Sequence, residues 1–273
     1  MKTIIIGAQG MLGQELVKVF ENYQPICWGR AEIDISNRED VNKKISEARP
    51  KLVINSAAYT DVDGAETNRD LAMKVNGYGV GSLAEACKRV GAILIHYSTD
   101  YVFDGRKSEG YKEGDQPKSP VNIYGESKLL GEELLQKNTD KYYLIRTSWL
   151  FGKSGKNFIE TMLTLARKGE TIKVVNNQHG KPTYAIDLAQ KTRELVEKNL
   201  PYGIYHITNE GSCTWYEFAK EIFKLAKINV RVEPVASEEF PTAAKRPTWS
   251  ILINTKLPPS RPWQEAVREY LKN

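Results

Sequence analysis

Residues 2–13, KTIIIGAQGMLG, decide the fold. The first five are rich in β-branched side chains and show no helical period, which predicts a buried strand. Glycines follow at Gly7, Gly10 and Gly13, and apolar residues then recur at helical spacing as far as Phe20. A strand, a glycine turn and a helix in this order bring backbone N–H groups and a helix N-terminus against a phosphate. The sequence therefore predicts the start of a dinucleotide-binding fold.

Each glycine has its own expected role. Gly7 permits the tight turn, Gly10 lets a phosphate approach, and Gly13 lets the helix pack closely on the strand. The alternative is an ordinary strand-to-helix turn that uses glycine only for its backbone freedom. The position of the motif, directly after a strand pattern, favours the dinucleotide site.

The second expected strand, residues 25–28, leads into Gly29 and Arg30. An acid at this position would bind a ribose 2′-hydroxyl, whereas an arginine can pair with a 2′-phosphate. No acid occurs before Glu32. Arg30 therefore favours NADPH over NADH, although a solvated surface arginine is the alternative and NADH stays open as a second cofactor.

Further apolar runs at residues 52–55, 92–97 and 142–147 alternate with helical patterns. This alternation is typical of an α/β fold with a Rossmann-type, doubly wound parallel sheet. A long helix is expected over about residues 65–90, with Asn76, Gly77, Gly79 and Gly81 in its middle. Such residues cost about 1 kcal/mol each relative to alanine, so we expect close packing or a bend there.

Tyr124 and Lys128 stand four residues apart and follow a Ser98-Thr99-Asp100 tripeptide at the end of an apolar run. Residues four apart share a helix face. At about 4 Å and an effective dielectric near 20, a lysine ammonium would favour the tyrosine phenolate by roughly 4 kcal/mol. That would bring the pKa of Tyr124 towards neutrality, which suits a general acid. Alone the pair is weak, because both residues are common on helix surfaces.

Composition excludes several classes of protein. Over 273 residues, 41% are hydrophobic and 27% are charged, as in ordinary globular proteins. No apolar stretch is long enough to span a membrane and no signal peptide precedes the first strand, so we expect a cytoplasmic protein. The net charge of +5 is spread along the chain, which argues against nucleic-acid binding. The cysteines and histidines show no disulfide or metal-ligand spacing, so no metal site is expected from the residues.

Several motifs together resemble a known family. The first glycine motif is joined by STDYVFDG at residues 98–105, YGESK at 124–128, RTSWLFG at 146–152 and KRP at 245–247. This set resembles the extended short-chain dehydrogenases/reductases and, among them, the dTDP-4-dehydrorhamnose reductase family. The resemblance covers residues 1 to about 268.

The resemblance implies roles for individual residues. The catalytic triad would be Thr99, Tyr124 and Lys128. The resemblance also implies cofactor-binding residues, which add to the glycine motif and Arg30 discussed above. The full expected set is Gly7, Gly10, Met11, Leu12, Gly13, Arg30, Asp34, Ile35, Ala58, Tyr59, Thr60, Tyr97, Tyr124 and Lys128. The expected substrate-binding residues are Thr99, Asp100, Trp149, Asn157 and Arg246. Trp149 is also open to a different interpretation, since a tryptophan after a strand is a core residue in most proteins.

The resemblance further implies the reaction and the domains. The reaction would be NADPH-dependent reduction of the 4-keto group of dTDP-4-dehydro-6-deoxy-L-mannose to dTDP-L-rhamnose, a nucleotide sugar used in cell-wall polysaccharide. Residues 1–150 and 180–202 would form the dinucleotide-binding domain, and residues 151–179 and 203–273 a smaller α/β substrate-binding domain. Residues 105–120 are expected to form a mobile surface loop, and residues 238–249 a loop that covers ligand.

Some properties stay open. Some members of the family use Mg²⁺ at a dimer interface built from several glutamates, and only Glu15 matches here, so Mg²⁺ is uncertain and the chain is a monomer or homodimer. One alternative function is another extended reductase or epimerase acting on a different nucleotide sugar. The other is a non-catalytic NADP-binding regulatory subunit, against which the intact triad argues.

Overall fold

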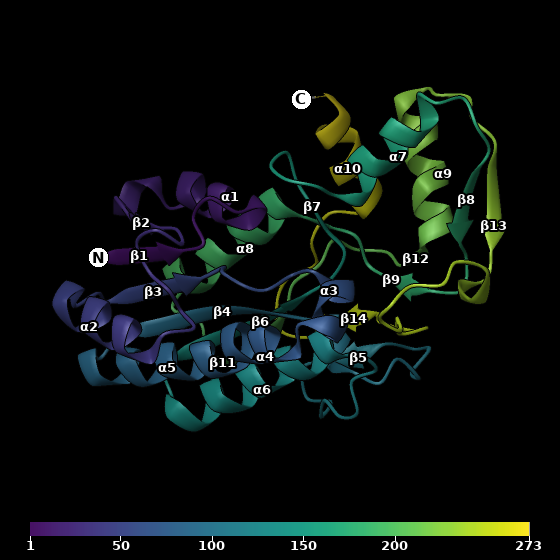
Figure 1. Ribbon diagram of the computed structural model, residues 1–273. Coiled ribbons are helices and arrows are strands. Elements are labelled where there is room, and N and C mark those ends of the chain that lie inside the picture. The colour runs from purple at the N-terminus through teal and green to yellow at the C-terminus, as the bar shows by residue number, and fades with distance from the viewer. Residues whose placement is uncertain (273) are drawn as a thin grey trace.

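The computed structural model describes residues 1–272, and its larger part is a six-stranded parallel sheet in the order β11-β6-β4-β3-β1-β2 (Figure 1). Its strands are β1 (Thr3–Ile6), β2 (Ile26–Trp28), β3 (Leu52–Asn55), β4 (Ile93–Thr99), β6 (Tyr142–Thr147) and β11 (Gly203–His206). The direction in which successive strands are added reverses at β1, so a crevice opens at the carboxyl ends of β1 and β3. The predicted Rossmann-type sheet is confirmed.

Helices cover both faces of this sheet (Figure 1). On one face lie α1 (Met11–Val19) and α8 (Ala185–Glu197), whose Leu16 and Leu188 belong to the same apolar cluster as Ile5. On the other lie α2 (Arg38–Ala48), α5 (Gly79–Val90) and α6 (Ile123–Asn138), with Leu83 in the same apolar cluster as Ile4. Since helices cover both faces, the central strands β1, β3, β4 and β6 read as continuous apolar runs rather than as alternating patterns, whereas Ile26 and Cys27 of the edge strand β2 are exposed. We name this sheet with its helices the sheet region.

The long helix expected over residues 65–90 is interrupted. The chain forms α3 (Val62–Thr67), α4 (Arg69–Ala72) and a π-helical turn, η2 (Met73–Tyr78), before α5 begins. Glycines let η2 and α6 approach closely, because a Cβ on Gly77 would lie 2.5 Å from Leu130 and one on Gly131 would lie 2.1 Å from the Asn76 carbonyl oxygen. The expected irregularity and close packing are confirmed.

The second region contains short strands and three helices and lies at the upper right of Figure 1. Its elements are β7 (Leu150–Phe151), α7 (Phe158–Ala166), β8 (Ile172–Val175), β9 (His179–Gly180), β10 (Thr183–Tyr184), β12 (Cys213–Thr214), α9 (Trp215–Ala226), β13 (Val232–Val235) and α10 (Trp263–Lys272). The strands pair two by two as β10-β7, β12-β9 and β13-β8. Thr214 caps α9 through a capping box with Glu217, and aromatic side chains fill the core.

Two expectations about boundaries differ from the structure. Strand β11 pairs in parallel with β6, so it lies in the sheet, whereas the sequence assigned residues 203–273 to the second region. Residues 105–120 contain β5 (Tyr111–Lys112), which pairs with β14 (Leu252–Ile253). The Glu113 carboxylate also accepts hydrogen bonds from the Thr255 N–H and hydroxyl, at 3.1 and 2.7 Å. This segment is therefore anchored at its centre by residues near the C-terminus.

The remaining short elements are the 3₁₀ turns η1 (Glu21–Tyr23), η3 (Asp100–Val102) and η4 (Ser237–Glu239). Across residues 1–272, no helix combines the length and the apolar character needed to cross a membrane.

Candidate active site

The glycine turn forms a site suited to an anion. Gly7 has φ 79°, and a Cβ there would lie 2.7 Å from the Ala57 nitrogen. A Cβ on Gly13 would lie 2.0 Å from the Gly7 carbonyl oxygen, so only glycine lets α1 approach β1 this closely. Gly10 is the N-cap of α1 and offers no side-chain acceptor to the N–H groups of the first turn. Those groups and the helix dipole suit an anion such as a pyrophosphate, and Met11 and Leu12 are the first two residues of the helix at this turn.

The residues after β2 surround the expected adenine and ribose end. Arg30 is exposed, while the Glu32 carboxylate accepts the Gly29 N–H at 2.7 Å. Asp34 is occupied locally, because its carboxylate accepts the Ser36 N–H and hydroxyl. Ile35 is buried. Both side chains are exposed, but the Glu32 carboxylate is tied to its own turn by the Gly29 N–H.

The loop after β3 holds the next expected cofactor residues, Ala58, Tyr59 and Thr60. The Asn76 amide of η2 clamps this loop, since it accepts the Tyr59 N–H at 2.8 Å and donates to the Tyr59 carbonyl at 2.9 Å. It also donates to the Ser127 hydroxyl on α6. Asn76 had no assigned role in the sequence, where it was noted only as a helix-weakening residue. The π-helical turn places its amide between the loop and α6.

The proposed triad meets at the end of β4. Thr99 is the last residue of that strand, and Tyr124 and Lys128 lie on the first two turns of α6. Asn122 caps α6, accepting the Gly125 N–H at 2.7 Å. A Cβ on Gly125 would lie 2.2 Å from the Tyr101 carbonyl oxygen, so glycine lets the helix begin directly against η3.

Lys128 is fixed inside the sheet region. It is 2% exposed, and its Nζ donates to the Tyr97 carbonyl at 2.6 Å and lies 3.4 Å from His96 Nε2. The Tyr97 phenol itself donates to Thr192 on α8 at 2.8 Å. Tyr97 therefore holds Lys128 through its backbone while its side chain joins the opposite helix layer.

The electrostatics differ from the sequence prediction. Burial, together with the charge of Asp100, raises the pKa of Tyr124 above its usual value, and hydrogen bonding with Thr99 opposes this only in part. Burial lowers the pKa of Lys128 to about 8, against a smaller raising effect of Glu132. The prediction that Lys128 brings the pKa of Tyr124 towards neutrality is therefore wrong for this structure, in which burial is the largest cause of the shift and raises the pKa. Tyr124 is a fully protonated phenol at neutral pH.

Asp100 lies beside this pair and is 2% exposed. The Thr99 hydroxyl donates to its Oδ1 at 2.8 Å. Burial raises the pKa of the Asp100 carboxyl to about 6, while the Ser250 and Thr99 side chains lower it. Ser250 comes from the segment after η4, so the C-terminal part of the chain contributes to the triad's surroundings.

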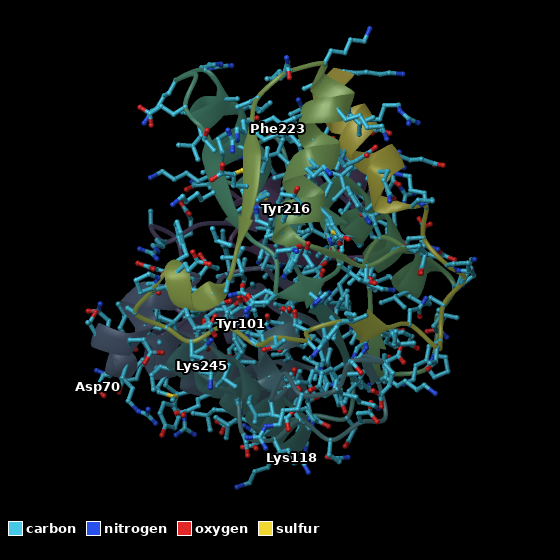
Figure 2. The ribbon with its side chains drawn as sticks, turned by 90° about the vertical axis from the view of Figure 1, so that its right-hand side faces the viewer. Asp70, Tyr101, Lys118, Tyr216, Phe223 and Lys245 are labelled. Carbon is cyan, nitrogen blue, oxygen red and sulfur yellow. The ribbon has the colours of Figure 1, made fainter. Side chains whose placement is uncertain are left out.

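Arg246 reaches the same place from that segment. Its guanidinium forms two hydrogen bonds of 2.6 Å with the Asp63 carboxylate on α3, which lowers the pKa of Asp63 to about 2. A further hydrogen bond with Tyr101 contributes to raising the pKa of Arg246. Figure 2 shows Tyr101 and Lys245 below α9, the helix that carries Tyr216 and Phe223. Asp63 was not singled out in the sequence, and no local signal ties it to a residue 183 positions away.

Trp149 and Asn157 have defined structural contacts. Trp149 has φ 46° and stacks on Trp215, with ring centroids 3.5 Å apart and planes 9° apart. A Cβ on Gly180 would lie 2.4 Å from its indole ring. Asn157 is the N-cap of α7, and its amide also donates to the Gly152 carbonyl at 2.8 Å. The structure does not place a ligand on either residue, so their substrate roles stay predictions.

Within residues 1–272, no group of three or more His, Cys, Asp or Glu side chains is arranged to hold a metal ion. Glu15, the residue matched to a metal site, is buried and pairs with Lys18 at 2.9 Å.

The fold and this arrangement define an NAD(P)-binding oxidoreductase of the short-chain dehydrogenase/reductase class. The glycine turn, the clamped loop after β3 and the Thr99, Tyr124 and Lys128 group all lie at the carboxyl edge of one parallel sheet.

Comparisons with known proteins give the family. The family model described as RmlD substrate binding domain matches residues 1–273, and the chain belongs to this family. The spore coat polysaccharide biosynthesis protein SpsK of Bacillus subtilis is 40% identical over 99% of this chain and 97% of its own length. A dTDP-4-dehydrorhamnose reductase of Burkholderia thailandensis is 40% identical over 94% of this chain and 92% of its own.

A solved structure agrees with them. The crystal structure of dTDP-4-dehydrorhamnose reductase from Bacillus anthracis, in complex with NADP, is 43% identical to this chain and superposes with a TM-score of 0.95. The match covers 100% of this chain and 99% of that one. Family and fold are thus established together over the whole length, and the family is one of dTDP-sugar reductases.

Proposed function

We propose that this protein reduces the 4-keto group of dTDP-4-dehydro-6-deoxy-L-mannose with NADPH to give dTDP-L-rhamnose. The observation that carries the proposal is the convergence of a half-buried phenol with a buried amine and a buried hydroxyl at the end of β4, on the sheet edge where the glycine turn also lies. NADPH, when bound, supplies the hydride. The relatives with this activity support the choice of substrate.

Tyr124 would donate the proton. Its raised pKa keeps the phenol protonated at neutral pH, and the alkoxide that forms on hydride addition is a far stronger base than a phenolate. Thr99 would hydrogen-bond the same substrate oxygen, and Lys128 would stabilise the phenolate left behind. Burial strengthens each of these interactions because the surrounding dielectric is low.

Arg246 would meet the charged part of the nucleotide sugar. It is half-buried beside Tyr101 and carries the positive charge that a diphosphate needs, although Asp63 already neutralises part of it. Trp149 could offer its ring to the sugar or base on the side away from Trp215. Asn157 is the weakest candidate for substrate binding, because its side-chain amide already caps α7 and donates a hydrogen bond to the Gly152 carbonyl.

The cofactor preference rests on Arg30. It is exposed at the end of β2, and the nearby acid, Glu32, is bonded to the Gly29 N–H. An exposed arginine here suits the 2′-phosphate of NADPH. The solved relative with bound NADP supports this assignment.

The alternatives are another extended reductase or epimerase that acts on a different nucleotide sugar, or a non-catalytic NADP-binding subunit. The decisive assay measures NADPH oxidation with the proposed substrate, dTDP-4-dehydro-6-deoxy-L-mannose (dTDP-4-dehydro-L-rhamnose), and with UDP- and GDP-linked 4-keto sugars. We expect turnover with the dTDP sugar and a much smaller kcat/KM with the other two. Preferred turnover of a UDP or GDP sugar would establish the first alternative, and binding of NADPH without any turnover would establish the second.

A further inference from the structure

A line of buried polar side chains runs from Lys128 into the sheet. His96 of β4 lies between Lys128 of α6 and Asn55 of β3, and all three are 2% exposed or less. Asn55 Nδ2 lies 3.1 Å from His96 Nδ1, and His96 Nε2 lies 3.4 Å from Lys128 Nζ. The roles proposed above for the triad make no use of His96 or Asn55.

The hydrogen bonds of Asn55 fix the tautomer of His96. Asn55 Oδ1 accepts the Ala57 N–H at 3.2 Å, so the amide NH₂ faces His96 Nδ1. Nδ1 must then accept, and in the neutral ring the proton is carried by Nε2. Burial, together with the charge of Lys128, lowers the pKa of His96 well below its ordinary value, against a smaller raising effect of a hydrogen bond with the Asn55 backbone, so the ring is neutral.

This tautomer acts on Lys128. The Nε2–H group faces Nζ, and only a neutral amine has a lone pair that can accept its hydrogen bond. If Lys128 were an ammonium, its N–H groups and the His96 Nε2–H group would both be donors, and no hydrogen bond could form between them. The contact of His96 therefore favours the amine over the ammonium, whereas the Tyr97 carbonyl can accept a hydrogen bond from either form.

We propose that His96 is a positioning residue that weakens the hold of Lys128 on its proton, so that Lys128 can return a proton to Tyr124 after each reduction. This inference rests on the proposed reductase function. In the step, a Lys128 N–H bond breaks and the Tyr124 O–H bond forms, which converts phenolate and ammonium to phenol and amine. The amine then takes a proton from solvent before the next turnover.

The charged groups around Lys128 are consistent with this role. On its own helix, Glu132 raises the pKa of Lys128, but its carboxylate is bound by Arg146 of β6, with Nη2 and Oε2 2.6 Å apart. On η3, Asp100 raises the pKa of Tyr124 and thereby helps the phenolate regain its proton. From β4 the facing groups are His96 and the Tyr97 carbonyl. Burial prevails over Glu132, and the pKa of Lys128 is lowered to about 8.

The test is the pH dependence of kcat for NADPH oxidation with the dTDP sugar. Loss of the Lys128 proton should make kcat fall at high pH. His96→Gln replaces the fixed N–H donor with an amide whose oxygen can accept from the ammonium, so this fall should move to higher pH by about one unit. Asn55→Asp should move it in the same direction, because a carboxylate would draw the ring proton to Nδ1 and leave Nε2 as an acceptor.

His206→Gln is the matched control. His206 is also a buried strand histidine, but its Nε2 lies 3.4 Å from Arg146 and its Nδ1 lies near the Ile253 carbonyl. In the His206→Gln variant, kcat should fall at the same high pH as in the wild type. The inference would be overturned if the pH at which kcat falls is unchanged in folded His96→Gln, or if it shifts by the same amount in His206→Gln.

A second measurement does not depend on activity or on any variant. ¹⁵N NMR of the wild-type histidine rings reports which nitrogen carries the proton. A neutral His96 with the proton on Nε2 is expected, and a proton on Nδ1 would overturn the inference even if the variants do not fold. Absence of turnover with every sugar would instead count against the proposed function, and the ring tautomer would still be decided.

Discussion

The sheet region and the second region are specified by different means. In the sheet region, Ile4, Ile5 and Ile6 of β1 are at most 1% exposed, and the central strands β3, β4 and β6 also have their own apolar runs in the sequence. In the second region, strands such as β7 and β10 have only two residues. Aromatic contacts between distant segments hold them, such as Phe151 on Tyr184 with ring centroids 5.1 Å apart. Local patterns specify the first region, and long-range packing specifies the second.

The residues expected to bind the cofactor or transfer the proton lie in a different part of the molecule from two of those expected to bind the substrate. The groups for cofactor binding and proton transfer lie in the sheet region, on β4, α6 and the glycine turn. Two of the substrate candidates, Trp149 and Arg246, lie in segments outside the sheet that are fixed by stacking or by an ion pair. Substitutions in the sheet region should therefore affect chemistry or NADPH, and those outside it should affect substrate binding and stability.

The largest effect is expected for Tyr124→Phe, which removes the proton donor and keeps the ring. The value of kcat should fall by about 10² to 10⁴, while NADPH binding, measured by fluorescence titration, stays close to wild type. Turnover near the wild-type rate in a folded Tyr124→Phe protein would remove Tyr124 as the acid.

Trp149→Ala should break both the stacking and the substrate contact. We expect the free energy of unfolding to fall by about 3 kcal/mol, because Trp215 and Gly180 both pack on the ring. The KM for the dTDP sugar should also rise, with the Kd for NADPH unchanged. The control is Trp263→Ala, a buried tryptophan of the same core. If Trp149→Ala changes KM no more than this control does, Trp149 is a core residue only.

Arg30→Ala tests the cofactor end of the sheet region. The affinity for NADPH should fall by roughly 1.5 to 3 kcal/mol, the size of a hydrogen bond to a charged group, and the affinity for NADH should hardly change. Isothermal titration with both cofactors separates the two. Equal losses would assign Arg30 to adenine packing or to structure.

The last prediction concerns acid stability at the end of β11, where His206 lies. Burial and Arg146 lower the pKa of His206 to about 4, so the folded state resists a proton that the unfolded chain binds below about 6.5. Stability should therefore fall as the pH decreases from about 6.5 to 4. Asp100 opposes this between about 6 and 3.8, because its pKa is raised in the folded state. Urea unfolding of wild type and His206→Gln should show a weaker pH dependence in the variant; an equal dependence would contradict this assignment.

The sequence predicted what local patterns encode. The strand, turn and helix of the glycine motif, the parallel sheet and the irregular helix near Gly77 are confirmed. Strand β11 was assigned to the wrong region because its partner, β6, ends more than 50 residues earlier and its own pattern is short.

The site was predicted less completely. Residue types and spacing suggested the triad, but they could not give the depth of burial, which reverses the expected pKa change at Tyr124. The contact of His96 with Lys128 and the pairing of Asp63 with Arg246 join residues 32 and 183 positions apart. Only the folded chain brings such residues together, so spacing in the sequence carries no sign of them.

The most direct test of the central claim follows the hydride itself. The protein is incubated with dTDP-4-dehydro-L-rhamnose and NADPH that carries deuterium at the transferable position of the nicotinamide C4, and the product is examined by NMR and mass spectrometry. The account predicts dTDP-L-rhamnose with one deuterium, located at C4 of the sugar. Product without deuterium, deuterium at another carbon, or exchange with solvent and no net oxidation of NADPH would contradict it.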